Sequence, residues 1–329
     1  MGADAVWITE ADVVESVDLP AAAGAVRDVL RREHQGSASA LPKTVTAWAA
    51  GDTLHALGGV AEGLGLAGTK TWAHTEGGTA PLLVLWDAAT GALRAVVEAF
   101  ALGQLRTASV SAVATDALAR RDATVMAMIG TGKQALAQVA AVISQRPIRE
   151  VRVFSPTPAH RAAFCARLCS DVSDVDVIEC RDLVSAVGPA DVITTATRSR
   201  EALLQLDMLG RDVHVNAVGA ITPERRELAD SLVAGAAAVV SDSPSTAESL
   251  SAELAAAATI ISLAQVVGAG WTRRGACATV FKAMGLGLAD VAVGAAALHA
   301  TLARGGGRPI AAIQRSTPQL FSTIQGGHQ

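Results

Sequence analysis

The chain has 329 residues, of which 50% are hydrophobic, and a formal net charge of −4. This length suits two domains, and the hydrophobic content is enough for a large buried core. No basic run is interleaved with aromatic residues, which argues against nucleic acid as a partner. The four cysteines form no CxxC pair, so we expect no metal site.

The sequence gives no sign of a membrane-bound or exported protein. Its N-terminus has neither a positively charged n-region nor an apolar h-region, and no stretch reaches about 20 uninterrupted apolar residues. We therefore expect no membrane span and a cytoplasmic location.

The first third of the chain predicts helices followed by strands. Residues 10–34 form one amphipathic helix or two short ones, with Pro20 starting the second. A polar, small-residue stretch, GSASALP (36–42), follows. Residues 43–99 contain short β-branched and aromatic runs punctuated by glycine, and 87–91 suits a hairpin turn. This first unit is predicted to be mostly antiparallel.

From residue 103 the pattern changes to alternating helices and apolar strands. A helix over 103–120 precedes a fully apolar strand at 124–129, and the tail from about 286 is helical again. Such alternation indicates a parallel sheet covered on both faces, and a tail that returns to the first unit makes that unit discontinuous. Further strands are expected near 151–154, 174–178, 191–195, 213–218, 238–241 and 259–262, with helices near 133–145, 157–170, 181–187 and 246–257.

A glycine motif follows the apolar strand and opens the next helix. Gly130, Gly132 and Ala135 give the pattern G-x-G-x-x-A. The first glycine allows the tight turn, the second lets the backbone approach a pyrophosphate, and the small alanine lets helix and strand pack closely. The free N–H groups of the helix N-terminus would then bind the phosphates. The sequence therefore predicts a Rossmann-type site for NAD or NADP.

The end of the next strand bears on which dinucleotide is bound. NAD enzymes usually carry an acid there, about 20 residues after the glycines, to hold the ribose 2′-hydroxyl. Here the strand ends at Ser155 and no carboxylate follows, while Thr157, His160 and Arg161 are close in sequence. We therefore favour NADP slightly over NAD, with the alternative that Arg161 is a solvated helix residue.

Two later strand ends also suit a cofactor site. Residues 194–197 and 216–220 are small, hydroxyl-bearing or glycine residues at the carboxyl ends of predicted strands, where Rossmann proteins bind their cofactor. The alternative for each is turn chemistry alone.

Six segments stand out together by their order and spacing: 68–70 (GTK), 106–109 (RTAS), 129–135 (IGTGKQA), 191–197 (DVITTAT), 216–220 (NAVGA) with 227–228 (EL), and 279–285 (TVFKAMG). Through them the chain resembles the ornithine cyclodeaminase/mu-crystallin family over nearly its full length. The resemblance implies an α/β fold, with a central Rossmann-type, doubly wound parallel sheet at 116–287. It also implies a discontinuous α+β substrate and dimerisation domain at 1–115 and 288–329, and a homodimer.

The resemblance also implies roles for individual residues. Lys70 matches a lysine that faces the substrate, Arg106 an arginine near the substrate carboxylate and nicotinamide, and Lys43 a basic residue that grips the carboxylate. Arginine can hold a carboxylate through two hydrogen bonds, while lysine offers a point charge. The residues on dinucleotide-contacting positions are Thr79, Lys133, Gln134, Thr197, Val218, Gly219 and Lys282.

One departure from the family pattern decides between activities. In cyclodeaminases and some alanine dehydrogenases an acid follows the NAVG segment and transfers protons, whereas this chain has Ile221 there. Loss of a positioned acid/base typically costs about 10²–10⁴-fold in rate, but reduction of a preformed iminium needs less help. The sequence therefore favours an NAD(P)H-dependent reductase of an α-imino (ketimine) acid, or the reverse amino-acid dehydrogenation. The alternatives are a cyclodeaminase-type lyase with recycled NAD and a non-catalytic, NADP-binding crystallin-like protein.

Two further side chains are expected on the face of the strand that carries Lys70. Alternation places Trp72 and His74 on that face. They form either part of the substrate pocket or part of the core or dimer interface of the first unit, and the burial habit of tryptophan favours the second interpretation.

Overall fold

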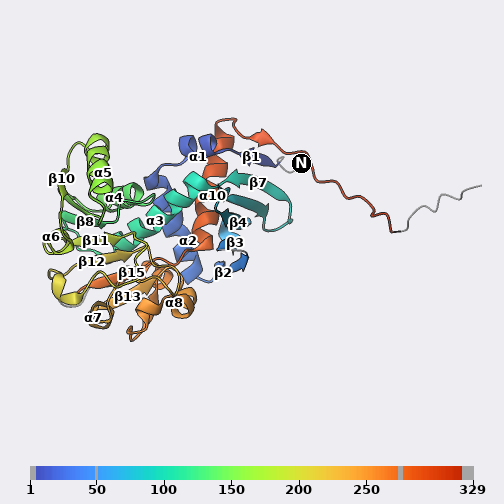
Figure 1. The fold of residues 1–329 in the computed structure, drawn as a ribbon. Coiled ribbons are helices and arrows are strands. Elements are labelled where there is room, and N and C mark those ends of the chain that lie inside the picture. The colour runs from blue at the N-terminus through green and yellow to red at the C-terminus, as the bar shows by residue number, and fades with distance from the viewer. Residues whose placement is uncertain (1–4, 49–50, 273–276, 321–329) are drawn as a thin grey trace, which may run out of the picture.

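The computed structural model describes residues 5–48, 51–272 and 277–320. Its strands form two eight-stranded sheets, and the long helices α2 (Leu19–His34), α3 (Phe100–Leu118) and α10 (Gly287–Ala303) lie in the middle of the molecule beside the first sheet (Figure 1). The described C-terminal residues beyond β16 run away from the body of the molecule as an extended segment (Figure 1).

The first sheet is built from the two ends of the chain. Its order is β16-β1-β7-β6-β4-β3-β2, and β5 pairs with β4. Neighbouring strands are antiparallel except for the parallel pair β1 and β7. The strands are β1 (Val6–Ile8), β2 (Ala38–Trp48), β3 (Asp52–Ala61), β4 (Leu66–Thr75), β5 (Gly78–Thr79), β6 (Leu82–Asp87), β7 (Leu93–Glu98) and β16 (Arg308–Pro309).

Helix α10 covers one face of this sheet at very short range. Gly59 in β3 and Gly68 in β4 permit this approach, because a Cβ on Gly59 would lie 2.6 Å from the Leu288 side chain, and one on Gly68 would lie 3.1 Å from that of Val291. The sheet and its helices thus share one apolar core, which includes Leu83, Leu85, Leu288 and Val291.

The N-terminal prediction was right for the helices but placed the start of the strands too late. Helix α1 (Glu10–Ser16) is separate from α2, which Pro20 opens in its first turn and Asp18 caps. The strands were expected from residue 43, but residues 38–42 already belong to β2. A proline is tolerated there because β2 is an edge strand and its pairing with β3 shifts register between Leu41 and Thr44.

In the second sheet every pair of neighbouring strands is parallel, and the order is β10-β9-β8-β11-β12-β15-β13-β14. The predicted fold class, a Rossmann-type sheet plus a second α+β unit, is confirmed. The strands are β8 (Val125–Ile129), β9 (Glu150–Phe154), β10 (Asp176–Glu179), β11 (Val192–Thr195), β12 (His214–Ala217), β13 (Ala238–Ser241), β14 (Ile260–Ser262) and β15 (Thr279–Lys282). The helices that connect them include α4 (Ala135–Ile143), α5 (Pro158–Asp171), α6 (Leu183–Val187), α7 (Asp230–Gly235), α8 (Pro244–Leu250) and α9 (Leu263–Ala269).

Several elements of this sheet departed from the predictions. The expected helix over 246–257 is split into α8 and the short 3-10 helix η3 (Ala252–Leu254). Helices α7 and α9 and strand β15 were not predicted. β15 is only four residues long and lies between β12 and β13, out of chain order, where all four residues are buried. From there the chain passes directly into α10 and returns to the first sheet.

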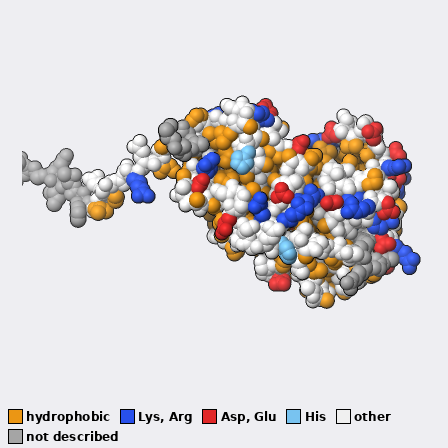
Figure 2. All heavy atoms as spheres, turned by 180° about the vertical axis from the view of Figure 1, so that it is seen from behind, with side chains coloured by type: hydrophobic (Ala, Val, Ile, Leu, Met, Phe, Trp, Pro, Cys, Tyr) orange, Lys and Arg blue, Asp and Glu red, His pale blue; other side chains and the backbone are white. Residues whose placement is uncertain are grey.

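We propose that the two sheets mark the two domains, with 1–115 and 288–329 in one and 116–287 in the other. Helix α3 contacts both, because it packs on α2 and α10 as well as on α4, β12 and β15. No helix within the described ranges is both long enough and apolar enough to cross a membrane. On the face shown in Figure 2, acidic and basic side chains are interspersed, with hydrophobic ones between them.

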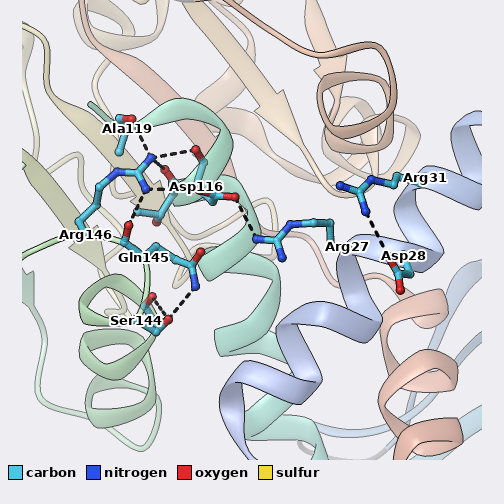
Figure 3. A network of polar contacts seen from close by, with 10 residues as sticks. Arg27, Asp28, Arg31, Asp116, Ala119, Ser144, Gln145 and Arg146 are labelled. Atoms are coloured by element: carbon cyan, nitrogen blue, oxygen red, sulfur yellow. Dashed lines mark hydrogen bonds and ion pairs between the residues drawn. The ribbon is translucent and has the colours of Figure 1, made fainter. Parts of the chain in front are cut away.

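Arg146 fastens the end of α3 to the Rossmann unit (Figure 3). It follows α4, and its Nη2 donates to the carbonyl oxygens of Thr115, Asp116 and Ala119 at 2.8–2.9 Å. The Asp116 carboxylate in turn accepts a hydrogen bond from Nη2 of Arg27, on α2, at 2.9 Å. Thr115 also accepts the backbone N–H of Ala119, so the buried arginine chiefly supplies donors to the last carbonyl groups of α3, which lie beyond the helical N–H groups.

We expect Arg146→Ala to lower the free energy of unfolding by about 2–4 kcal/mol, because the carbonyl oxygens of Asp116 and Ala119 lose this donor and that of Thr115 keeps only the Ala119 N–H. Urea unfolding would measure the change. Arg31→Ala is the control, since Arg31 forms an exposed ion pair with Asp28 (Figure 3) and should matter by less than about 0.5 kcal/mol. If both substitutions lowered the free energy of unfolding equally, the contacts of Arg146 with the end of α3 would not stabilise the fold specifically.

Candidate active site

A cleft of about 1090 Å³ opens at the carboxyl ends of β8, β9, β11 and β12. This is the edge of a Rossmann sheet where dinucleotides bind. Nine of the residues predicted to contact the cofactor line it together: Gly130, Gly132, Lys133, Gln134, Ser155, Thr157, Thr197, Val218 and Gly219.

The glycines of the cleft fit a dinucleotide for different reasons. Gly130 has φ +101°, and a Cβ there would lie 2.6 Å from the Ala196 carbonyl oxygen. A Cβ on Gly219 would collide with Thr197 and Glu227. In contrast, a Cβ on Gly132 would meet no described protein atom within 4 Å. Protein packing therefore explains Gly130 and Gly219, whereas the open space at Gly132 suits the close approach of a phosphate.

The start of α4 offers free polar groups to the same cleft. No side chain caps this helix, and Oε1 of Gln134 at its N-cap is buried without a hydrogen-bond partner among the described residues. Unsatisfied backbone N–H groups at a helix N-terminus favour an anion. The residues present thus fit the pyrophosphate of a dinucleotide.

The end of β9 differs from the expectation in one respect. Ser155, Thr157 and His160 line the cleft, but Arg161 does not. Its Nε donates to Glu179 Oε1 at 2.9 Å and its Nη1 to the Ser155 carbonyl oxygen at 2.7 Å. Arg161 is buried and holds the ends of β9 and β10 together, so its charge is already paired.

Three other residues predicted to contact the cofactor lie outside the cleft lining. Ala135 is buried in the first turn of α4, behind the glycine loop. Thr79 is exposed in β5 of the first sheet, paired with His74. Lys282 is fully buried at the end of β15, where its Nζ lies 2.6 Å from Glu253 Oε1.

The predicted substrate residues Lys70 and Arg106 meet at a carboxylate that the sequence analysis did not identify. Lys70 projects from β4, Arg106 from α3 and Asp290 from the first turn of α10. Oδ1 of Asp290 lies 2.5 Å from Lys70 Nζ and 3.2 Å from Arg106 Nε. Lys70 is 4% exposed and Asp290 is fully buried, so the three charges form a desolvated cluster.

Lys43 and Asp242 extend this cluster. Lys43 is half-buried on β2, and burial, followed by the nearby Arg106 charge, lowers its pKa. Asp242 follows β13 and accepts the backbone N–H groups of Met284 at 2.7 Å and Gly285 at 3.1 Å. Burial raises the pKa of Asp242, against the effect of these hydrogen bonds and of Arg106.

The environment of Lys70 makes its proton exchangeable near neutral pH. Burial, followed by the positive charge of Arg106, lowers the pKa of Lys70 to about 8, although Asp290 acts in the opposite direction. A lysine in this state is mostly an ammonium at pH 7 and loses its charge as the pH rises through about 8.

The cationic cluster of Lys43, Lys70 and Arg106 adjoins the dinucleotide cleft. The terminal nitrogens of Arg106 lie 3.7 and 3.9 Å from the position of a Cβ on Gly285, just beyond β15. β15 pairs with β12, whose continuation supplies Val218 and Gly219 to the cleft. A small anion held by these cations would therefore lie beside the bound dinucleotide.

Aromatic and histidine side chains surround Lys70 on the same face of the sheet. Lys70 Nζ lies 5.2 Å from the centroid of the Trp72 ring, which stacks on His55 at 4.6 Å. Trp72 is half-buried and His74 is exposed in the single chain, so neither belongs to the core, and their place in a dimer interface stays a prediction. Trp72 instead borders the predicted substrate site.

Buried carboxylates, which the sequence analysis gave no role, shape the far wall of the cleft. Glu227 accepts the Thr195 hydroxyl and the backbone N–H groups of Thr197, Gly219 and Ala220. Glu253 in turn accepts the N–H groups of Glu227 and Leu228 and pairs with Lys282. Lys282 therefore does not line the cleft; it pairs with Glu253, which binds the backbone of Glu227, which in turn binds the cleft wall.

One sequence signal could have found the missed Asp290, and a second marks the lysines of the site, which were identified. Asp290 is the only carboxylate in α10, an otherwise apolar helix in which a buried charge needs a reason. Moreover, only four of the 27 basic residues are lysines, and all four (Lys43, Lys70, Lys133 and Lys282) belong to this region.

Comparison with known proteins agrees with this geometry. Residues 4–302 match the model of the ornithine cyclodeaminase/mu-crystallin family. The chain is 32% identical over 211 residues to the ketimine reductase mu-crystallin of Mus musculus, a match that spans 64% of this chain and 66% of that protein. It is 30% identical over 240 residues to a Δ1-pyrroline-2-carboxylate reductase of Bacillus cereus, over 70% of this chain and 73% of that protein.

A solved structure shows the same architecture. The iminosuccinate reductase of Paracoccus denitrificans, in complex with NAD⁺, superimposes with a TM-score of 0.85 at 25% identity, covering 94% of this chain and 99% of that one. This chain therefore belongs to the ornithine cyclodeaminase/mu-crystallin family.

Proposed function

We propose that this protein is an NAD(P)H-dependent reductase of an α-imino (ketimine) acid, or catalyses the reverse amino-acid dehydrogenation. The observation that carries the proposal is the cationic cluster of Lys43, Lys70 and Arg106 beside the dinucleotide cleft. The similarity to ketimine and Δ1-pyrroline-2-carboxylate reductases supports it.

The three cations suit a substrate that brings a carboxylate. The Nε edge of Arg106 is engaged by Asp290, so its terminal nitrogens form the edge that can present two parallel donors to a carboxylate. Lys43 adds a second, half-buried charge. Holding the carboxylate in this way fixes the imine carbon next to the nicotinamide, which is the positioning that hydride transfer requires.

Lys70 is the proposed proton donor. Bound NADPH or NADH supplies the hydride to the imine carbon. The Lys70 ammonium gives its proton to the imine nitrogen, the C=N double bond becomes a single bond, and the product is the amino acid. Hydrophobic Ile221, 38% exposed after β12, offers no acid at the position that cyclodeaminases use. A cyclodeaminase, by contrast, would show no net consumption of cofactor.

We expect purified protein to oxidise NADPH or NADH in the presence of Δ1-pyrroline-2-carboxylate, or of 2-oxo acids with ammonia or methylamine. The rate should fall as the pH rises through about 8, because Lys70 then loses its proton. Lys70→Met should lower kcat by about 10²–10⁴-fold, the usual contribution of a positioned acid. Absorbance at 340 nm would follow each reaction.

The control is Arg31→Met, which removes an exposed cation from α2 and should leave the rate unchanged. Full activity of Lys70→Met would remove the proton-donor role. No turnover with any of these substrates, by protein that binds dinucleotide, would contradict the reductase proposal and favour the lyase or a non-catalytic binder.

For the cofactor, we propose a preference for NADP over NAD. The cleft wall at the end of β9 is made by Ser155, Thr157 and His160, without a carboxylate to repel a 2′-phosphate. Because Arg161 is paired with Glu179, the 2′-phosphate would be held by hydroxyl and imidazole groups, which predicts a modest preference.

We expect Ser155→Asp to weaken NADPH binding at least about tenfold and NADH binding by only a few-fold, since the new carboxylate repels a phosphate but can accept the ribose hydroxyl. Fluorescence titration with both cofactors would measure this. Ser155→Ala serves as the control for loss of the hydroxyl. Equal weakening of both cofactors by the aspartate variant would place the 2′ position elsewhere.

We further propose that the protein is a homodimer, as family resemblance implies. Leu41, Val45, Trp48 and Leu54, on the outer strands β2 and β3, are large apolar side chains that are 43–49% exposed in the single chain. Burial of such side chains is a common basis of obligate association. Sedimentation equilibrium should give twice the mass of the chain, and a single-chain mass would contradict the proposal.

A further inference from the structure

We propose that Asp290 is a positioning residue. Its carboxylate holds the Lys70 ammonium and the Arg106 guanidinium in one arrangement and keeps Lys70 charged for the substrate. The inference rests on the proposed function, because it assigns a role within the same site.

The geometry shows one oxygen shared by two cations from different elements. Oδ1 of Asp290 binds Lys70 Nζ of β4 at 2.5 Å and lies 3.2 Å from Arg106 Nε of α3. The other oxygen, Oδ2, is buried and has no hydrogen-bond partner among the described residues. We would expect a carboxylate that only stabilises the fold to form hydrogen bonds with both of its oxygens. Asp290 uses one oxygen, for the two cations, which indicates that its role is to position Lys70 and Arg106.

The surrounding charges make such a carboxylate necessary. Lys70 faces Arg106 from α3, Asp290 from α10 and Lys43 from β2. Two of these three neighbours are cations, and burial adds to their effect, so Asp290 is the group that opposes deprotonation of Lys70. More distant charges are Asp242, which acts on Lys43 and Arg106, and Glu33 on α2, which acts on Asp242.

The position of Asp290 in the chain suits this role. It lies in the first turn of α10, where free backbone N–H groups favour a negative charge. The same helix packs closely on β3 and β4 through Leu288 and Val291, so the carboxylate cannot move far relative to Lys70. Because the chain passes from β15 into α10, the Asp290 carboxylate is held in a fixed place beside Lys70 and Arg106.

The test uses the full-length protein with saturating dinucleotide, and compares the wild type with Asp290→Asn. Two properties are followed between pH 6 and 9: kcat and KM for Δ1-pyrroline-2-carboxylate, and the affinity for pyruvate by calorimetry. The pyruvate titration needs no turnover, so it reports on Asp290 even if the reductase proposal fails. Dinucleotide affinity serves as the measure of an intact fold.

In the wild type, both kcat/KM and pyruvate affinity should fall as the pH rises through about 8. In Asp290→Asn the inflection should move down by about one pH unit or more, because an opposite charge at this distance shifts a pKa by about that much. Pyruvate should then bind about fivefold more weakly or worse at pH 8, with a smaller loss at pH 6 and unchanged dinucleotide affinity. A uniform loss at every pH, or an inflection that stays in place, would overturn the proposal.

Two further variants keep the test decisive. Asp242→Asn is the matched control, since it removes a buried carboxylate near Arg106 that does not touch Lys70, and its inflection should stay near the wild-type value. Asp290→Glu retains the charge but displaces it, so it should keep the inflection near 8 while raising KM. It replaces Asp290→Asn if that variant does not fold, and an inflection lowered by Asp290→Glu would then contradict the proposed role.

Discussion

A buried carboxylate oxygen, Oδ1 of Asp290, organises the chemistry of this molecule. It joins a strand of the first sheet, the helix that bridges the two sheets and the helix that returns from the second sheet. Burying charges is costly unless they are paired, so this carboxylate offsets the cost of bringing the two cations together where the three elements meet. The return of the chain through β15 and α10 is therefore the structural condition for a cationic site beside a Rossmann cleft.

Buried carboxylates also organise the cofactor cleft, but there they bind backbone N–H groups. Glu227 binds a hydroxyl and three backbone N–H groups at the ends of β11 and β12, and Glu253 binds the backbone of Glu227. Loops at the carboxyl edge of a parallel sheet lack partners for their N–H groups, and here buried carboxylates supply them. The cleft walls are thus fixed before any dinucleotide binds, which lowers the entropy cost of binding.

Local signals allowed much of this structure to be predicted from the sequence. The apolar strand before Gly130, the helix after Gln134 and the proline in the first turn of α2 each act within a few residues of themselves, and all appear as expected. Elements decided by distant contacts were missed. Strand β15 exists because β12 and β13 flank it, and β2 runs through Pro42 because it is an edge strand. Asp290 and Lys70 are 220 residues apart, so no local pattern links them.

The central claim is that hydride passes from a bound dinucleotide to the imine carbon of an acid held by Lys70, Arg106 and Lys43. The most direct measurement is the fate of deuterium when [4,4-²H₂]NADPH, which carries deuterium at both C4 positions, reduces Δ1-pyrroline-2-carboxylate in ordinary water. Mass spectrometry and proton NMR should find one deuterium on the α-carbon of the proline formed and none on its nitrogen. Proline without deuterium, or no proline from protein that binds the cofactor, would contradict direct hydride transfer in this site.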